Sequence, residues 1–153
     1  MSDLRELYQE IILDHGRHPR NFGACPTATH HKEGFNPLCG DKILLHITER
    51  NGIIEKIMFE GSGCAISMAS ASLMSECLVG KKFEEVESLF SAFHEVVTNH
   101  DASLEAKENL GKLAVLSGVS EFPARVKCAT LAWHTFRAAI ENNAAAISTE
   151  EMT

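Results

Sequence analysis

Thiol and carboxylate side chains occur at a spacing that favours a metal or sulfur site. Cys39 and Asp41 lie two residues apart in the turn-like segment Asn36-Pro37-Leu38-Cys39-Gly40-Asp41, and two further cysteines follow it along the chain. Zinc prefers thiolate, imidazole and carboxylate ligands, and four of them complete its tetrahedral coordination. We therefore predict one metal or sulfur site formed by Cys39, Asp41, Cys64 and Cys128.

A β-hairpin between the first two of these cysteines would bring them together. Asn51-Gly52 lies between two segments rich in isoleucine and leucine, residues 42–49 and 53–60. Asn-Gly favours a two-residue type I′ turn, because both of its central residues need a positive φ. Cys39 and Cys64 are equidistant from this turn, so they would face each other across strands about 5 Å apart. A β-bulge would offset this pairing by one residue.

The expected charge of this site predicts a neighbouring cation. Three thiolates and one carboxylate around zinc leave a net negative charge, and Arg125 precedes Cys128 by one helical turn. We assign Arg125 as the counter-charge, with an ordinary surface arginine as the alternative. Cys64 would begin a helix at residues 66–79, where the helix dipole and free N–H groups lower a thiol pKa.

Two interpretations of such a metal site stay open at this point. Four protein ligands are typical of a structural zinc site. However, a carboxylate is a harder and more replaceable ligand than a thiolate, and glycine-rich loops would leave the site accessible. These two features favour a labile site that could release one thiolate.

The remaining cysteines and a histidine pair are weaker candidates. Cys77 falls among apolar residues of the predicted helix, so we expect an inert, buried thiol, and Cys25 has no assigned role. His30-His31 could bind a metal, but neighbouring residues of a strand point to opposite faces. We therefore favour a role other than metal binding for His30 and His31 as a pair.

Composition limits the functional classes. The chain has 153 residues, consistent with one domain over residues 1–153, and its net charge of −7 argues against binding to nucleic acid or to anionic membranes. Its first residues show no signal-peptide pattern, and no apolar run approaches the length of about 18 residues typical of a membrane span. Five cysteines, in the reducing compartment that we expect, favour metal or catalytic use over disulfides. We therefore expect a cytoplasmic protein.

The pattern of apolar residues predicts an α+β fold, with about three antiparallel strands covered by helices. The expected elements are helices at 3–14, 66–79, 83–98, 104–116 and 124–142, an edge strand at 28–35, the hairpin, a loop at 117–123 and a frayed tail at 148–153.

Three segments of the chain resemble a known family. Asn36–Asp41, Gly61–Ser67 and Phe122–Trp133 closely resemble the SufU branch of the IscU/NifU-like iron–sulfur cluster assembly proteins. IscU scaffolds have a histidine directly before the third cysteine, where this chain has Lys127. SufU-type proteins carry an insertion before that cysteine, and residues 99–120 resemble it.

The resemblance implies a SufE/IscU-like fold and a zinc site at Cys39, Asp41, Cys64 and Cys128. It also implies a partner, a SufS-type pyridoxal-phosphate cysteine desulfurase. Its persulfide sulfur would be accepted by Cys39 and passed to the downstream iron–sulfur assembly machinery, which makes the chain a zinc-dependent sulfurtransferase. Two alternatives remain: a scaffold that holds a transient iron–sulfur cluster, and a non-catalytic zinc-containing adaptor that activates the desulfurase.

Overall fold

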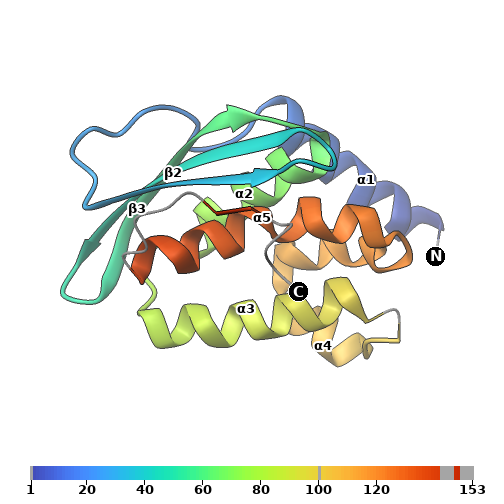
Figure 1. Ribbon diagram of the computed structural model, residues 1–153. Coiled ribbons are helices and arrows are strands. Elements are labelled where there is room, and N and C mark those ends of the chain that lie inside the picture. The colour runs from blue at the N-terminus through green and yellow to red at the C-terminus, as the bar shows by residue number, and fades with distance from the viewer. Residues whose placement is uncertain (1, 100, 142–146, 149–153) are drawn as a thin grey trace.

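The computed structural model describes residues 2–99, 101–141 and 147–148, with side chains described for residues 6–99 and 101–141. Its elements are α1 (Ser2–Arg17), β1 (His30–Asn36), β2 (Asp41–Arg50), β3 (Ile53–Ser62), α2 (Ala65–Cys77), α3 (Phe83–Thr98), α4 (Leu104–Asn109), the 3₁₀ helix η1 (Gly111–Glu121), α5 (Pro123–Ile140) and β4 (Ile147–Ser148). Figure 1 shows the sheet with α5, α3 and α4 below it and α1 to its right, which confirms the predicted α+β fold. Most of the predicted tail lies outside the described residues.

The sheet has the strand order β3-β2-β1-β4. The pairs β1–β2 and β2–β3 are antiparallel, as predicted, and the two-residue strand β4 runs parallel to β1. The predicted strand at residues 28–35 is present as β1, but its predicted position at the edge of the sheet is wrong, because β1 lies between β2 and β4. A two-residue partner this far along the chain leaves no pattern in the sequence that periodicity could detect.

The predicted hairpin is present, and its register contains a bulge. Asn51 and Gly52 have φ values of 56° and 79°, as a type I′ turn requires. The register shifts between Thr48 and Glu49, so the residues from Thr48 back to Lys42 pair one position away from the uninterrupted register. The expected pairing of Cys39 with Cys64 is therefore wrong as a strand pair; β2 begins only at Asp41, and Cys39 lies in the turn before it.

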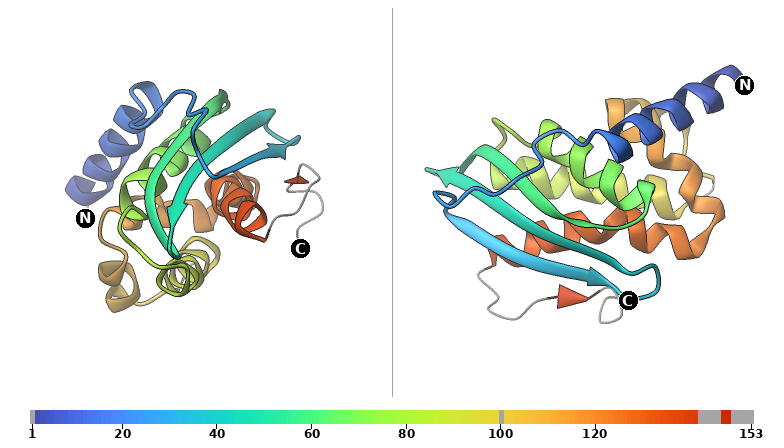
Figure 2. Two further views of the ribbon diagram at one scale, coloured as in Figure 1. Left: turned by 90° about the vertical axis from the view of Figure 1, so that its left-hand side faces the viewer. Right: turned by 90° about the horizontal axis from the view of Figure 1, so that it is seen from above.

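One face of the sheet packs on the helices. Figure 2 shows α2 and α5 against this face, with α1 outside α2. Apolar side chains of β2 and β3 fill the interface and are fully buried: Ile43, Leu45, Ile47, Ile57 and Phe59. Gly34 of β1 lies against Thr135 of α5, where an added Cβ would collide with the Thr135 hydroxyl. The glycine therefore lets α5 approach β1 directly.

Helix α2 is rich in small residues, and these let two other helices approach it. The Ser70 hydroxyl donates to the Ala129 carbonyl of α5 at 2.6 Å. On the other side, Nδ1 of the buried His15 lies 2.7 Å from the Ser72 hydroxyl, which joins α1 to α2. The small side chains of α2 thus allow close contacts with α5 on one side and α1 on the other.

The prediction of a helix at 104–116 followed by a loop at 117–123 is wrong in detail. Helix α4 ends at Asn109, and the 3₁₀ helix η1 spans Gly111–Glu121. Gly111 has a φ of 59°, which a right-handed α-helix cannot include. Within the predicted insertion, residues 104–109 form α4 and residues 111–120 form most of η1. No helix in the described part of the chain combines the length and apolarity needed to cross a bilayer.

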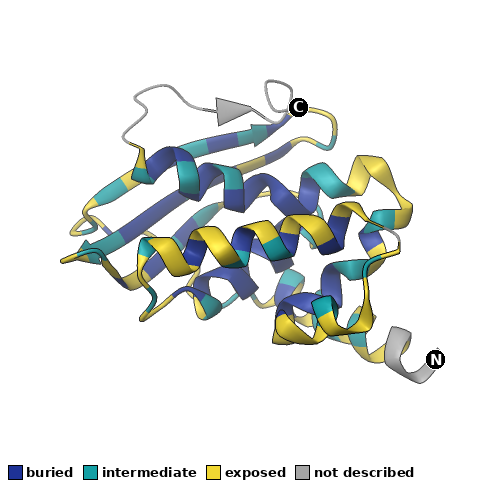
Figure 3. Ribbon diagram, turned by 90° about the horizontal axis from the view of Figure 1, so that it is seen from below, coloured by how far each residue is buried: buried dark blue, intermediate teal, exposed yellow. Residues whose placement is uncertain are grey.

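Helix α3 covers α5 through stacked aromatic rings. The Phe93 and Trp133 rings are stacked with centroids 4.8 Å apart, and both side chains are buried. Figure 3 shows the opposite side of α3 exposed. This stack joins α3 to α5, the helix that carries Cys128.

We expect Phe93→Ala to lower the free energy of unfolding by about 3–5 kcal/mol, because it removes a fully buried ring and leaves a cavity. Urea denaturation followed by circular dichroism measures this change. Leu104→Ala is the control; Leu104 is 69% exposed, so the change should stay within about 0.5 kcal/mol. Equal effects of the two substitutions would contradict the packing described for α3.

Candidate metal centre

Three elements bring the predicted ligands to one end of the sheet, the right-hand end in Figure 1. Cys39 lies in the four-residue turn between the paired residues Asn36 and Asp41. Cys64 is the N-cap residue of α2, and Cys128 lies in the second turn of α5. Asp41 and Cys128 are buried, whereas Cys39 and Cys64 are partly exposed. The centre is therefore internal on one side and open on the other.

The distances within this centre suit a metal ion. The ligand atoms of Cys39, Asp41 and Cys128 all lie within 4.8 Å of one another, and the two sulfurs are 3.2 Å apart. Tetrahedral zinc with Zn–S bonds of 2.3 Å would hold two sulfurs about 3.8 Å apart, so a small opening of the Cys39 turn suffices. The Cys64 sulfur lies beside this group, 4.0 Å from Oδ2 of Asp41.

The Asp41 carboxylate is held by two neutral donors. Its Oδ1 accepts from the backbone N–H of Cys64 at 2.8 Å, and its Oδ2 accepts from the Asn36 amide at 3.0 Å. A carboxylate offers about four lone-pair sites, so these two bonds leave room for a metal bond. An added Cβ at Gly63 would lie only 2.5 Å from Oδ1 of Asp41. The glycine therefore allows the close approach of Asp41 to the start of α2.

Asn36 is a residue of this centre that the sequence did not identify as a candidate. It is fully buried, and its amide donates both to Asp41 and to the Cys128 sulfur, the latter at 3.3 Å. It thus joins the β1–β2 turn to α5 behind the ligands, a position that orients metal ligands in known sites. The available signal was the two-residue period of a strand, which places Asn36 on the same buried face of β1 as Lys32 and Gly34.

The thiols of Cys64 and Cys128 differ in acidity. A hydrogen bond from Cys128 lowers the pKa of Cys64 to about 6, and the backbone amides of Ser67 and Ile66 at the start of α2 contribute as well. The Ser67 amide donates to the Cys64 sulfur at 3.4 Å. The pKa of Cys128 is raised, first by this hydrogen bond to Cys64 and then by burial. The predicted position of Cys64 at the N-terminus of a helix is confirmed. In the absence of metal, Cys64 is the thiolate and Cys128 the neutral thiol at neutral pH.

Arg125 reaches this centre from the first turn of α5. Its side chain is exposed, and its pKa is raised by a hydrogen bond to the Cys128 sulfur and by the charge of the neighbouring thiolates. The cation thus lies where the negative charge of the site requires one. Its assignment as a functional residue stays a prediction.

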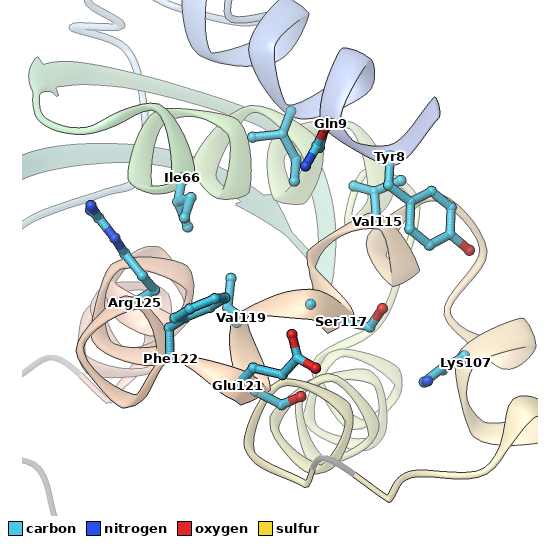
Figure 4. A pocket seen from close by; sticks show the side chains of 13 residues that line it. Tyr8, Gln9, Ile66, Lys107, Val115, Ser117, Val119, Glu121, Phe122 and Arg125 are labelled. Carbon is cyan, nitrogen blue, oxygen red and sulfur yellow. The ribbon is translucent and has the colours of Figure 1, made fainter. Parts of the chain in front are cut away.

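A cavity of about 500 Å³ adjoins the centre on the side of Arg125. Figure 4 shows Arg125 and Ile66 at one end of this cavity and Tyr8 at the other. The lining comes from α1, the start of α2, α4, η1 and the start of α5. Phe122, which also lines it, is 59% exposed. The open side of the centre thus continues into a partly apolar hollow.

The remaining cysteines do not join the centre. Cys25 is buried with its sulfur 3.9 Å from the Thr27 hydroxyl. Cys77 is half-buried, less than predicted, and burial raises its thiol pKa. A raised pKa leaves little thiolate at neutral pH, which agrees with an inert thiol.

In metal-free protein kept reduced, we expect Cys64 to react with iodoacetamide at a rate that reaches half its maximum near pH 6, because its thiolate forms there. Cys77 should react appreciably only above pH 9, since its pKa is raised above the ordinary value of 9.0. Peptide mapping after timed alkylation gives both rates in one sample. Equal pH profiles for the two thiols would contradict the described stabilisation of the Cys64 thiolate.

Comparisons with known proteins agree with this arrangement. The family model described as "NifU-like N terminal domain" matches residues 7–148. The chain is 41% identical over 134 residues to "Zinc-dependent sulfurtransferase SufU" of Bacillus subtilis, covering 86% of this chain and 88% of that protein. It is 38% identical over 144 residues to "Iron-sulfur cluster assembly scaffold protein IscU" of Streptococcus pyogenes, covering 94% and 89%.

Among solved structures, the chain resembles a putative iron–sulfur cluster assembly scaffold protein for the SUF system from Fervidobacterium islandicum. The TM-score is 0.79 at 30% identity, and the match covers 89% of this chain and 98% of that one. Together with the family model, this structural match leads to one conclusion: the chain belongs to the NifU-like N-terminal domain family, with SufU and IscU proteins among its relatives.

Proposed function

We propose that the protein is a zinc-dependent sulfur acceptor that takes persulfide sulfur from a cysteine desulfurase for iron–sulfur cluster assembly. The observation that carries this proposal is the position of Cys39. Its thiol is partly exposed on a turn, yet its sulfur lies 3.2 Å from that of the buried Cys128. The identity of 41% to a protein named as a zinc-dependent sulfurtransferase supports it.

The four proposed ligands differ in how firmly they are held. Cys64 and Cys128 belong to the ends of helices, and Asp41 is buried with two hydrogen-bond donors. Cys39 instead follows Leu38, which is 60% exposed, and precedes Gly40, which has a φ of 73°. When bound, zinc keeps coordinated thiols deprotonated at neutral pH. Cys39 is therefore the ligand that can leave the centre with least disturbance.

The proposed reaction is a thiolate–persulfide exchange at Cys39. The thiolate of Cys39 attacks the terminal sulfur of the persulfide on the desulfurase cysteine and forms a new S–S bond. The original S–S bond breaks, and its electron pair leaves on the desulfurase cysteine as a thiolate. Cys39 then carries the transferred sulfur, which a downstream thiol can accept by the same chemistry. Arg125 balances the negative charge of the remaining sulfurs.

For the partner we propose a SufS-type pyridoxal-phosphate cysteine desulfurase. The SufU-like features support this choice, namely Lys127 before the third cysteine and the segment at residues 99–120. Leu38 and Phe122 are both about 60% exposed, on the turn of Cys39 and at the start of α5. Exposed apolar side chains beside a reactive group are suited to contact with a protein partner.

A scaffold that holds an iron–sulfur cluster is the second candidate. The relative from Streptococcus pyogenes is named as a scaffold, and thiolates bind iron–sulfur clusters as well as zinc. Lys127 argues for the first candidate, because it occupies the position before Cys128 where the resemblance to IscU scaffolds would require a histidine.

We expect Cys39→Ser to abolish sulfur uptake from a SufS-type desulfurase supplied with cysteine, because the accepting thiolate is lost. Mass spectrometry of the peptide carrying Cys39 should show one added, reductant-sensitive sulfur in the unsubstituted protein. Cys77→Ser is the matched control and should accept sulfur normally.

Metal content has to be measured beside this uptake, since Cys64→Ser and Cys128→Ser would fail mainly through loss of zinc. Added sulfur found only on Cys64 or Cys128 would exclude Cys39 as the acceptor. Stoichiometric iron and sulfide in freshly purified protein, in place of about one zinc, would favour the scaffold.

Arg125→Ala should weaken zinc retention or sulfur uptake by about tenfold or more, the range typical of groups that support metal ligands. Arg125→Lys should also be impaired, because an ammonium group cannot reproduce the planar, forked donor set of a guanidinium. Competition with a chromogenic chelator measures zinc retention, and circular dichroism checks that the fold is unchanged. Full zinc retention and uptake in both variants would make Arg125 an ordinary surface residue.

A further inference from the structure

Three side chains of types that bind metals form a row on the face of the sheet that the helices leave uncovered. His31 of β1 is paired in register with His46 of β2, and their Nδ1 atoms lie 2.7 Å apart. Nε2 of His46 lies 2.7 Å from a carboxylate oxygen of Glu60 on β3. The left view of Figure 2 shows this face of the sheet opposite the helices. None of these residues belongs to the thiolate centre.

The carboxylate determines which nitrogen of His46 carries hydrogen. An ionised carboxylate only accepts hydrogen bonds, so Nε2 of His46 is the donor to Glu60. A neutral His46 therefore presents a lone pair at Nδ1, directed at His31. The same carboxylate–imidazole pair orients metal-bound histidines, because it fixes the tautomer and makes the free nitrogen more basic. His46 is only 6% exposed, which further limits rotation of its ring.

We propose that Nδ1 of His31 and Nδ1 of His46 form a second metal site, for a divalent ion that prefers nitrogen ligands, such as Ni²⁺. In the metal-free state the Nδ1 hydrogen of His31 lies between the two rings. On binding, this hydrogen is lost to solvent and Nε2 of His31 takes one up, so that His31 stays neutral and two lone pairs face the ion. His31 is exposed, so its ring can turn and its Nε2 can reach water.

The separation of the two nitrogens favours one coordination geometry over another. With metal–nitrogen bonds of about 2.1 Å, two neighbouring ligands lie about 3.0 Å apart at a right angle and about 3.4 Å apart at a tetrahedral angle. The observed 2.7 Å is closer to the right-angled arrangement. Square-planar and octahedral nitrogen–oxygen sites suit Ni²⁺ and Cu²⁺, whereas tetrahedral sites with thiolates suit zinc.

Further oxygen ligands are available on the same face. Glu33 lies two positions along β1 from His31, so its side chain points to the same side of the sheet, and it is partly exposed. Its carboxylate and water can occupy the remaining positions of the ion. His30 is excluded, because the alternation of the strand directs it to the other face. The two sites of the protein thus differ in ligand chemistry, thiolates in one and imidazoles in the other.

Titration of zinc-loaded protein with Ni²⁺, followed by calorimetry, tests this site. We expect one Ni²⁺ to bind while zinc is retained, and His31→Ala to weaken this binding at least tenfold. His30→Ala is the matched control, since it removes an imidazole from the adjacent position, and it should bind Ni²⁺ as the unsubstituted protein does. Glu60→Gln should weaken binding about tenfold, as loss of a ligand-orienting group does.

Elemental analysis and near-ultraviolet absorption locate the bound ion. Retained zinc without nickel–thiolate absorption supports the imidazole site. Displacement of zinc with such absorption, and no further Ni²⁺ bound, would overturn the proposal. Undiminished Ni²⁺ binding in His31→Ala would overturn it as well. His31 is exposed, so its replacement leaves the fold intact and the result can be interpreted directly.

Discussion

The arrangement of the candidate metal centre depends on one constraint, the burial of the Asp41 carboxylate. Asp41 is 2% exposed, and a buried carboxylate is costly unless donors or cations compensate it. The backbone of Cys64 and the amide of Asn36 supply two donors. Because Asn36 also donates to the Cys128 sulfur, satisfying this one carboxylate ties the β1–β2 turn to α2 and to α5.

Residue types suggested which side chains could form this site, but they did not indicate how the structure brings those side chains to one end of the sheet. Asn51-Gly52 correctly predicted the hairpin, and the hairpin register suggested that Cys39 faces Cys64. The shift between Thr48 and Glu49 removes that pairing, and a bulge leaves no reliable mark in a sequence. Asp41 links the two segments instead, because the β1–β2 turn ends at Asp41 and the backbone N–H of Cys64 donates to its carboxylate.

The other differences also arise from contacts between distant segments. Periodicity located α3 well, because its buried residues form an apolar stripe along one side of the helix. Helix α5 was also predicted, although its residues 128–133 are buried without interruption. Periodicity failed at residues 104–121, where Gly111 interrupts the helix and buried residues continue into η1. The place of Asn36 in this centre could not be predicted for a similar reason, since its partner Cys128 lies 92 residues further along the chain.

The unequal support of the proposed ligands explains how a closed site could act as a sulfur acceptor. The hydrogen bonds that hold Asp41, Cys64 and Cys128 run among these residues, Asn36 and the start of α2. Of the contacts described, only two involve Cys39: its sulfur lies 3.2 Å from that of Cys128, and its backbone N–H donates to a carbonyl within its own turn. Departure of Cys39 would therefore leave the other three ligands in place, so the centre could open without unfolding the elements that build it.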